Sequence, residues 1–280
     1  MKDSLPQLLA DSSDTLQLSA DNIWVTEHMS AVSYPKEQTQ EKFQIENDSF
    51  WFKQRNQCLL EVFKNYPPAG LCVDVGGGNG FVAQAIQNAG IETALLEPNE
   101  IGIKNARLRG IQNLICATWQ DAQFRPETLP AVGLFDVLEH IEDDLTFLHS
   151  IHQTLTAQGR LYLTVPTFPF LWSAVDVFDG HFRRYTQQSL SQVLQQAGFR
   201  IEYFTYFFQY LLPPILLLRA LPTKLGILKS KDINNTSSDD KVHPAFHLIF
   251  DLIARREQKR IQKNKSLTFG SSCLCVVQKV

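Results

Sequence analysis

The feature that most constrains this chain is a run of glycines directly after a short apolar segment. Leu71 to Val75 predicts a buried β-strand, and four of the five residues 76–80 are glycine. From Phe81 the sequence has helical character. A strand, a glycine-rich turn and a helix form the first half of a nucleotide-binding βαβ unit, in which glycine lets the ligand approach the backbone. The helix N-terminus then offers free N–H groups to a polar or anionic group of the ligand.

The spacing of the glycines indicates which nucleotide binds. A dinucleotide fingerprint that starts at Gly76 fails at Phe81, and it is met only if it starts late, at Gly78. The pattern Asp74-x-Gly76-x-Gly78-x-Gly80 fits without a shift and resembles motif I of the class I S-adenosylmethionine (SAM) methyltransferases. The resemblance implies that Asp74 lies near the amino group of the methionine part of SAM, which rests on the glycines.

A second carboxylate follows the next predicted strand, 93–97. Glu97 ends this strand about 20 residues after the glycines, where an acid can accept both ribose hydroxyl protons. SAM and NAD both carry that ribose, so Glu97 does not separate them. The alternative for Glu97 is an exposed acid at a strand end.

The third predicted strand, 114–117, departs from the resembled family. Members of that family usually carry an acid here that binds the adenine amino group, and this chain lacks it. Trp119 is predicted to stack on adenine, and Gln120 or Asp121 to meet its amino group.

The fourth predicted strand, 131–135, runs into the segment Asp-Val-Leu-Glu-His at 136–140, which is close to the matching segment of many small-molecule methyltransferases. Ligands of open α/β sheets bind at the carboxyl ends of the strands. Asp136 and His140 are therefore predicted to line the methyl-transfer end of the site. A structural hydrogen bond is the alternative role for His140.

The loop after the fifth predicted strand, 160–166, is dense in polar side chains. It resembles a bacterial branch of the same family with the pattern Leu-Trp-Ser…Asp…Gly-His-x-Arg-Arg-Tyr. His181 is a candidate general base for a hydroxyl or amine acceptor. Arg183 or Arg184 could hold an acidic substrate group, or one of them could pair with Asp176 to order the loop. The candidate catalytic residues are His181 and Tyr185 of this loop together with His140. The candidate substrate-binding residues of the loop are Trp172, Asp176, Arg183 and Arg184.

These elements predict an α/β fold with a Rossmann-like, seven-stranded methyltransferase sheet and helices on both faces. The resemblance implies the strand order 3-2-1-4-5-7-6 with an antiparallel last strand. Residues 199–207 are predicted to form the sixth strand and 267–277 the seventh.

We expect an N-terminal extension (1–47) and a SAM-binding domain (48–280) with a helical, basic insertion at 208–265. The insertion carries 11 Lys and Arg against 5 Asp and Glu, a charge of +6, which leaves −9 on the rest of the chain. Apolar surface beside basic charge could contact an anionic membrane or a lipid-like substrate. The alternative is a helical lid over the pocket. Residues 234–240 are predicted to be mobile.

Charge and composition limit which partners, metals and cellular locations are expected for this protein. A net charge of −3 argues against a nucleic-acid partner, and the five cysteines show no zinc-binding spacing, so no metal is expected. Residues 1–20 lack the features of a secretory signal, and no apolar run is long enough to span a membrane. We expect a cytoplasmic protein, with peripheral contact at the inner membrane surface through residues 208–265 as a further expectation.

The sequence therefore predicts an enzyme that transfers a methyl group from SAM to a small-molecule or lipid- or saccharide-like acceptor, by O- or N-methylation. An NAD-dependent oxidoreductase and a non-catalytic SAM-binding or membrane-surface protein are the alternatives. The identity of the acceptor and the oligomeric state are not contained in the sequence.

Overall fold

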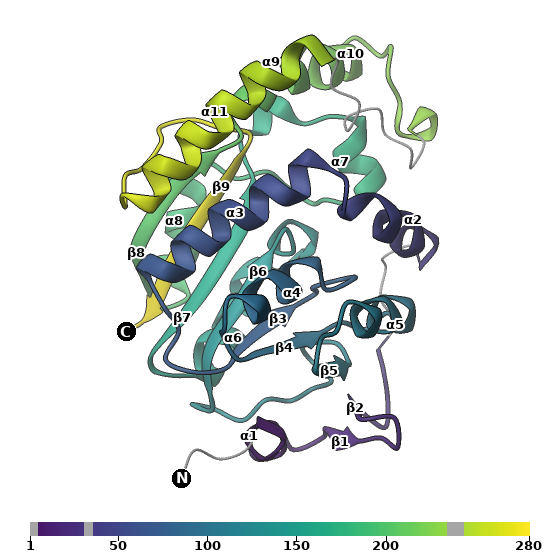
Figure 1. Ribbon diagram of the computed structural model, residues 1–280, viewed down its shortest axis with the longest axis vertical. Coiled ribbons are helices and arrows are strands. Elements are labelled where there is room, and N and C mark those ends of the chain that lie inside the picture. Colours follow the sequence, from purple (N-terminus) through teal and green to yellow (C-terminus); the bar gives the residue numbers. More distant parts are fainter. Residues whose placement is uncertain (1–4, 31–35, 234–243) are drawn as a thin grey trace.

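The structure, a computed structural model, describes residues 5–30, 36–233 and 244–280. A nine-stranded sheet forms its centre, with helices on both faces (Figure 1). The strands lie in the order β1-β2-β5-β4-β3-β6-β7-β9-β8. They are β1 (Gln17–Leu18), β2 (Ile23–Val25), β3 (Cys72–Val75), β4 (Thr93–Leu96), β5 (Asn113–Cys116), β6 (Leu129–Phe135), β7 (Leu155–Pro166), β8 (Phe199–Phe207) and β9 (Ser272–Lys279).

Seven neighbouring strands of the sheet confirm the predicted topology. Their order, β5-β4-β3-β6-β7-β9-β8, is the order 3-2-1-4-5-7-6 when these seven are numbered along the chain. β9 pairs antiparallel with both β7 and β8, and the other core pairs are parallel. The two additional strands, β1 and β2, extend the sheet beyond β5.

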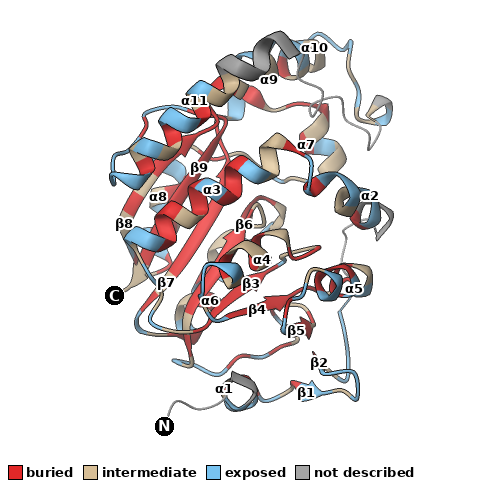
Figure 2. Cartoon of the chain, in the orientation of Figure 1, coloured by how far each residue is buried: buried red, intermediate tan, exposed pale blue. Residues whose placement is uncertain are grey.

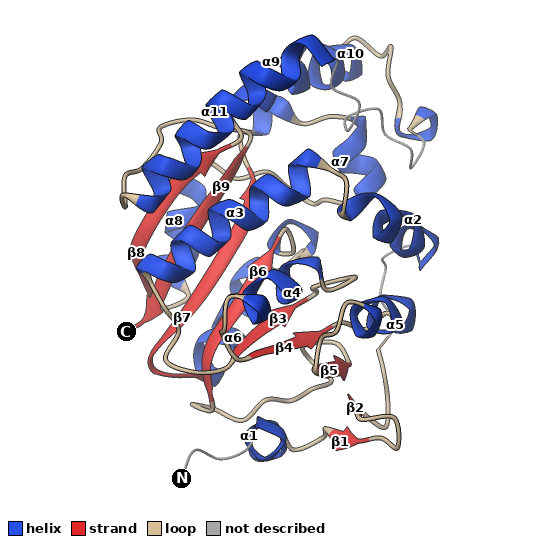
Figure 3. Cartoon of the chain, viewed as in Figure 1, coloured by secondary structure: helices blue, strands red, loops and turns tan. Residues whose placement is uncertain are grey.

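Helices connect the strands and cover both faces of the sheet (Figure 3). They are α1 (Leu5–Ser12), α2 (Lys36–Glu46), α3 (Phe50–Asn65), α4 (Phe81–Asn88), α5 (Glu100–Leu108), α6 (Asp144–Thr154), α7 (Ala174–Asp179), α8 (Gln187–Gln196), α9 (Leu212–Ile215), α10 (Leu221–Lys224) and α11 (Pro244–Gln262). Short 3₁₀ or π turns lie between them, including η3 (Gln209–Leu211) and η4 (Leu216–Ala220).

Burial on both faces explains why the central strands read as continuous apolar runs. In β3, Val73 and Val75 belong to the core under α6 and α8, whereas Cys72 belongs to the core under α3 and α11. Successive side chains of a strand point to opposite faces, so a strand covered on both sides has no polar face. Figure 2 shows these strands as the most continuously buried part of the chain.

The N-terminal residues are joined to the sheet. β2 pairs in parallel with β5, and Trp24 of β2 is 7% exposed within the main core. The sequence predicted only an N-terminal extension for this region. Strands of two and three residues are too short to show a period, so they could not be located before the structure.

The insertion after β8 packs α11 along α3. The Gln54 side chain donates to the Ala254 carbonyl (3.0 Å), and Asn65 donates to that of Ile261 (2.9 Å). The buried Glu257 carboxylate accepts the amides of residues 208 and 209. The insertion is therefore fastened over the sheet edge, and the stretch 234–240 lies outside the described residues.

Replacement of the docked indole tests whether the N-terminal strands belong to the fold. We expect Trp24→Ala to lower the free energy of unfolding by about 3 kcal/mol, because it empties a buried site. Urea unfolding measures this, with Leu108→Ala as control. Leu108 is 77% exposed, so its loss is expected to change stability by less than about 0.5 kcal/mol. Equal stabilities of the two variants would show that β2 is not part of the cooperative unit.

Candidate active site

The glycine-rich turn between β3 and α4 presents bare backbone to a cavity. Gly78 has a φ of 55°, and a Cβ added there would meet nothing within 4 Å, so its outer side is open space. The inner side of the turn is tight, because a Cβ at Gly77 would lie 2.5 Å from the Asp74 carboxylate. The turn is thus packed against Asp74 below and is free for a ligand above.

Asp74 is fully buried beneath this turn. Neither of its carboxylate oxygens has a hydrogen-bond partner among the described residues. Burial raises the pKa of Asp74 to about 7, against the opposing effect of the nearby Arg55 guanidinium. An unsatisfied buried carboxylate at a binding loop is a group that a positively charged ligand would stabilise.

Glu97 follows β4 and faces the same turn. Its Oε2 accepts the Gly78 amide (2.9 Å) and its Oε1 accepts the Asn99 amide (2.8 Å). Burial raises the pKa of Glu97 to about 6. The two amides fix the carboxylate at the cavity wall, and each oxygen keeps a second lone pair for a ribose hydroxyl.

Helix α2 covers the turn through a buried polar network that sequence reasoning missed. Asn79 donates to the carbonyl of Thr39 (3.0 Å) and accepts from Asn105 (2.9 Å). Arg109 donates to the Asn79 carbonyl (3.1 Å) and pairs with Glu46 (2.8 Å). No sequence motif indicates these contacts, because their members come from two separate helices, α2 and α5 with its C-cap Arg109, and from the glycine-rich turn.

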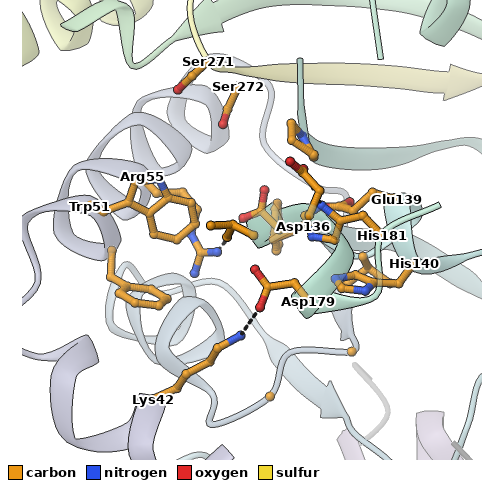
Figure 4. A pocket seen from close by; sticks show the side chains of 18 of the residues that line it. Lys42, Trp51, Arg55, Asp136, Glu139, His140, Asp179, His181, Ser271 and Ser272 are labelled. Carbon is orange, nitrogen blue, oxygen red and sulfur yellow. Dashed lines mark hydrogen bonds and ion pairs between the residues drawn. The ribbon is translucent and has the colours of Figure 1, made fainter. Parts of the chain in front are cut away.

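Asp136 ends β6 in a left-handed conformation, with a φ of 60°. Its carboxylate pairs with Arg55 of α3 at 2.6 Å, and both residues line the cavity (Figure 4). The Arg55 guanidinium lies over the Trp51 ring at 4.8 Å. Backbone strain at a non-glycine residue persists only where surrounding contacts hold it, and it is common at ligand sites. Sequence reasoning found Asp136 and missed its partner Arg55.

The loop after β7 is ordered around the buried carboxylate of Asp176. Asp176 accepts from His181 Nδ1 (3.0 Å), Arg184 Nε (2.7 Å) and the Ser173 amide (2.8 Å). Burial would raise the pKa of Asp176, but the hydrogen bonds from His181 and Arg184 prevail and lower the pKa to about 2. The bond at Nδ1 orients the imidazole and leaves its Nε2 for chemistry, as in an acid–histidine dyad.

His140 lies beside His181, with ring centroids 4.7 Å apart and the rings nearly perpendicular. Burial, reinforced by the neighbouring His181, lowers the pKa of His140 to about 3, so this imidazole is neutral at physiological pH. Glu139 is buried next to them, and burial raises its pKa well above the ordinary value.

Glu139, His140 and His181 are the described residues best placed to hold a metal ion, since their ligand atoms lie within 4.8 Å of one another. Sequence spacing could not show this set, because His181 follows the other two by about 40 residues. The absence of a metal stays a prediction.

Two candidate cofactor-binding residues, Trp119 and Gln120, follow β5 and line the cavity in different ways. Trp119 is 6% exposed, packs against Phe124 and Phe147, and donates from Nε1 to Ser150 Oγ (2.9 Å). Gln120 lines the cavity from an exposed position. Trp119 is therefore anchored in the core and reaches the site only with part of its surface.

Four predicted residues are not part of the cavity lining, and one of them, Gly80, packs against Ala106 of α5. The Tyr185 hydroxyl donates to Asp144 (2.7 Å), Arg183 pairs with the same Asp144 (2.6 Å), and Trp172 also lies outside the lining. Burial raises the pKa of Tyr185, so it stays a neutral phenol. In this structure Arg183 and Tyr185 fasten the loop to α6, whereas Asp176, His181 and Arg184 face the cavity.

The glycine-rich turn, Glu97, the Arg55–Asp136 pair and the two histidines meet in one cavity of about 2120 Å³. Its polar part lies between the glycine-rich turn and the Asp136–His181 region. Its apolar part extends under the insertion, where residues such as Tyr210, Pro213, Ile215 and Phe250 line it. Typical small-molecule pockets hold about 300–1,000 Å³, so this cavity has room for two ligands.

The strand order and the nucleotide end of the site define a class I SAM-dependent methyltransferase. A family model described as a methyltransferase domain matches residues 44–203, which is more than half of the chain. The chain therefore belongs to the methyltransferase domain family.

Individual relatives agree with this assignment. Human mitochondrial ubiquinone biosynthesis O-methyltransferase is 28% identical over 120 residues, covering 38% of this chain and 32% of that protein. The match therefore spans about a third of the length of this curated relative.

Two solved structures share the fold. A SAM-dependent methyltransferase from Thermotoga maritima, described as a possible histamine N-methyltransferase, superposes with a TM-score of 0.54 at 14% identity and covers 87% of this chain and 95% of its own. A putative methyltransferase from Bacillus halodurans gives 0.52 at 18% identity, with 79% and 98% covered.

The residues present fit SAM as the cofactor. The open face of Gly78 can take the methionine part, the partnerless carboxylate of Asp74 lies beneath it, and Glu97 is held by the Gly78 amide along the same edge. The Arg55–Asp136 pair lines the same cavity.

A Cβ on the open face of the turn should block this ligand without unfolding the protein. Gly78→Ala and Gly90→Ala both place a side chain at positive φ with no protein atom within 4 Å, so each is expected to cost about 1–2 kcal/mol. Isothermal titration with S-adenosylhomocysteine is expected to show at least a tenfold weaker affinity for Gly78→Ala alone. Equal affinities of the two variants would place the cofactor elsewhere.

Proposed function

We propose that the protein transfers a methyl group from SAM to a hydroxyl or amine of a small-molecule acceptor, with lipid- or saccharide-like compounds included in that class. The observation that carries the proposal is the meeting of the glycine-rich turn and the Asp176–His181 pair in one cavity. The family model and the structural neighbours give no support to an NAD-dependent oxidoreductase or to a non-catalytic protein.

Bound SAM supplies an electrophilic methyl group on a sulfonium centre, and its loss leaves S-adenosylhomocysteine. Methyl transfer is an in-line displacement, so the chain contributes alignment and, for a weak nucleophile, a base. His181 Nε2 receives the proton from the acceptor, because Asp176 fixes the opposite ring nitrogen and stabilises the imidazolium that forms. Neutral His140 positions the acceptor beside it.

The ion pair between Arg55 and Asp136 orders the wall between cofactor and acceptor. Its 2.6 Å contact is largely shielded from water, which keeps the aromatic side chains of α3 against the cavity. Arg184 is held by Asp176 and so serves the loop first. An anionic group of the acceptor would contact the Arg184 guanidinium only on the side that faces the cavity.

Removal of the imidazoles tests the mechanism. We expect His181→Ala to lower kcat by about 100-fold or more, in line with the loss of a general base, while the affinity for S-adenosylhomocysteine stays unchanged. Turnover is measured as S-adenosylhomocysteine release with a panel of hydroxyl and amine acceptors. For a hydroxyl acceptor, part of the loss should be recovered at high pH, where solvent takes the proton.

His149→Ala is the matched control, since His149 is exposed on α6 outside the cavity lining. His140→Ala completes the series. Full turnover by both His181→Ala and His140→Ala would refute a role for either imidazole.

A further inference from the structure

An exposed apolar surface lies on the insertion, at the end of the molecule opposite the N-terminal strands (Figure 1). We call residues 217–227 the leucine ridge; they belong to η4, α10 and the turn that follows. Five large apolar side chains of the ridge are at least 40% exposed. They are Leu217 (60%), Leu218 (71%), Leu221 (40%), Leu225 (73%) and Ile227 (72%). Contiguous apolar surface of this kind marks an interaction site on a protein that is otherwise ordinary in composition.

The leucine ridge lies in a stretch of net positive charge, because residues 216–232 carry four basic residues against one acid, Asp232. The basic residues are Arg219, Lys224, Lys229 and Lys231. The acids of the neighbouring α7 do not offset this charge, because Asp176 is buried and Asp179 faces Lys42 at 4.0 Å (Figure 4). An exposed apolar strip flanked by basic residues complements an anionic lipid surface.

The same segment also forms a wall of the cavity. Leu217, Leu218 and Leu228 line the cavity that contains the glycine-rich turn. Leucine side chains of the ridge thus also belong to the cavity wall, so a compound with an apolar chain could pass from the ridge into the apolar part of the cavity. The described residues contain no helix long and apolar enough to cross a bilayer, so contact would be at its surface.

We propose that the leucine ridge rests on an anionic lipid bilayer and that the methyl acceptor carries an apolar chain that enters the cavity from it. The bilayer contact does not depend on the proposed methyltransferase function. The class of acceptor rests on that proposed function. Basic residues attract the surface and leucine side chains insert at the headgroup boundary.

Vesicle co-sedimentation tests the contact. The full chain is incubated without SAM, with vesicles of phosphatidylcholine alone or mixed with phosphatidylglycerol. We expect sedimentation with the mixed vesicles, weakened by high salt. The double variant Leu225→Glu/Ile227→Glu, at two ridge positions outside the cavity lining, should bind at least tenfold more weakly, whereas Leu108→Glu, on the similarly exposed Leu108 of α5, should bind as the unmodified chain does.

Three outcomes would overturn the contact: no binding of the unmodified chain to the mixed vesicles, an equal loss in Leu108→Glu, or a ridge variant that changes only the self-association measured by light scattering. The last outcome would assign the ridge to a second copy of this chain. Retained binding of S-adenosylhomocysteine by the ridge variant shows that its fold is intact and separates this test from the test of the cofactor site.

The acceptor class is tested with methyl-labelled SAM and a bacterial lipid extract. Label that moves into the organic phase with the unmodified chain, and less so with the ridge variant, is the expected result. Label found only in water-soluble products would refute an apolar acceptor, while the methyltransferase activity itself would stand.

Discussion

The site depends on parallel strand pairing at the centre of the sheet. β4, β3, β6 and β7 are neighbours that all run in one direction, so their carboxyl ends reach the same edge. The glycine-rich turn, Glu97, Asp136 and the His181 loop each follow one of these strands. Chemistry that is spread over about a hundred residues of sequence is thereby collected in one cavity.

Two buried carboxylates at that edge have opposite surroundings. Asp176 has donors from His181, Arg184 and Ser173, which hold its pKa near 2, whereas Asp74 has no hydrogen-bond partner among the described residues and a pKa of about 7. The Asp176 carboxylate orders the loop after β7, since its three donors all belong to that loop. The Asp74 carboxylate carries a desolvation cost, which is relieved when a ligand binds or when the carboxylate is protonated.

Much of this arrangement was readable from the sequence. The seven core strands, their order and the placement of Asp74, Glu97 and Asp136 at strand ends follow from apolar runs, glycine spacing and a family resemblance. β8 was predicted with the bounds that the structure shows, because nine residues of strand-forming sequence follow a clear helix end at Gly198. Patterns of this length determine element type reliably.

The remainder depended on contacts between segments distant in sequence. Arg55 reaches Asp136 across 81 positions, and Thr39 of α2 reaches Asn79 across 40, with no local pattern in either case. Tyr185 and Arg183 share a motif with His181, yet their side chains contact Asp144 of α6 instead of the cavity. The short strands β1 and β2 were hidden because two or three residues carry no period.

The central claim is that the glycine-rich turn binds SAM, and thermal unfolding with added ligands tests it most directly. A ligand of the native state at 100 times its dissociation constant adds about 2.7 kcal/mol of stability. For a domain of this size, that should raise the midpoint by about 5 to 10 °C. The account predicts this shift with SAM and with S-adenosylhomocysteine, and none with NAD. A shift with NAD alone, or no shift with any of the three, would contradict it.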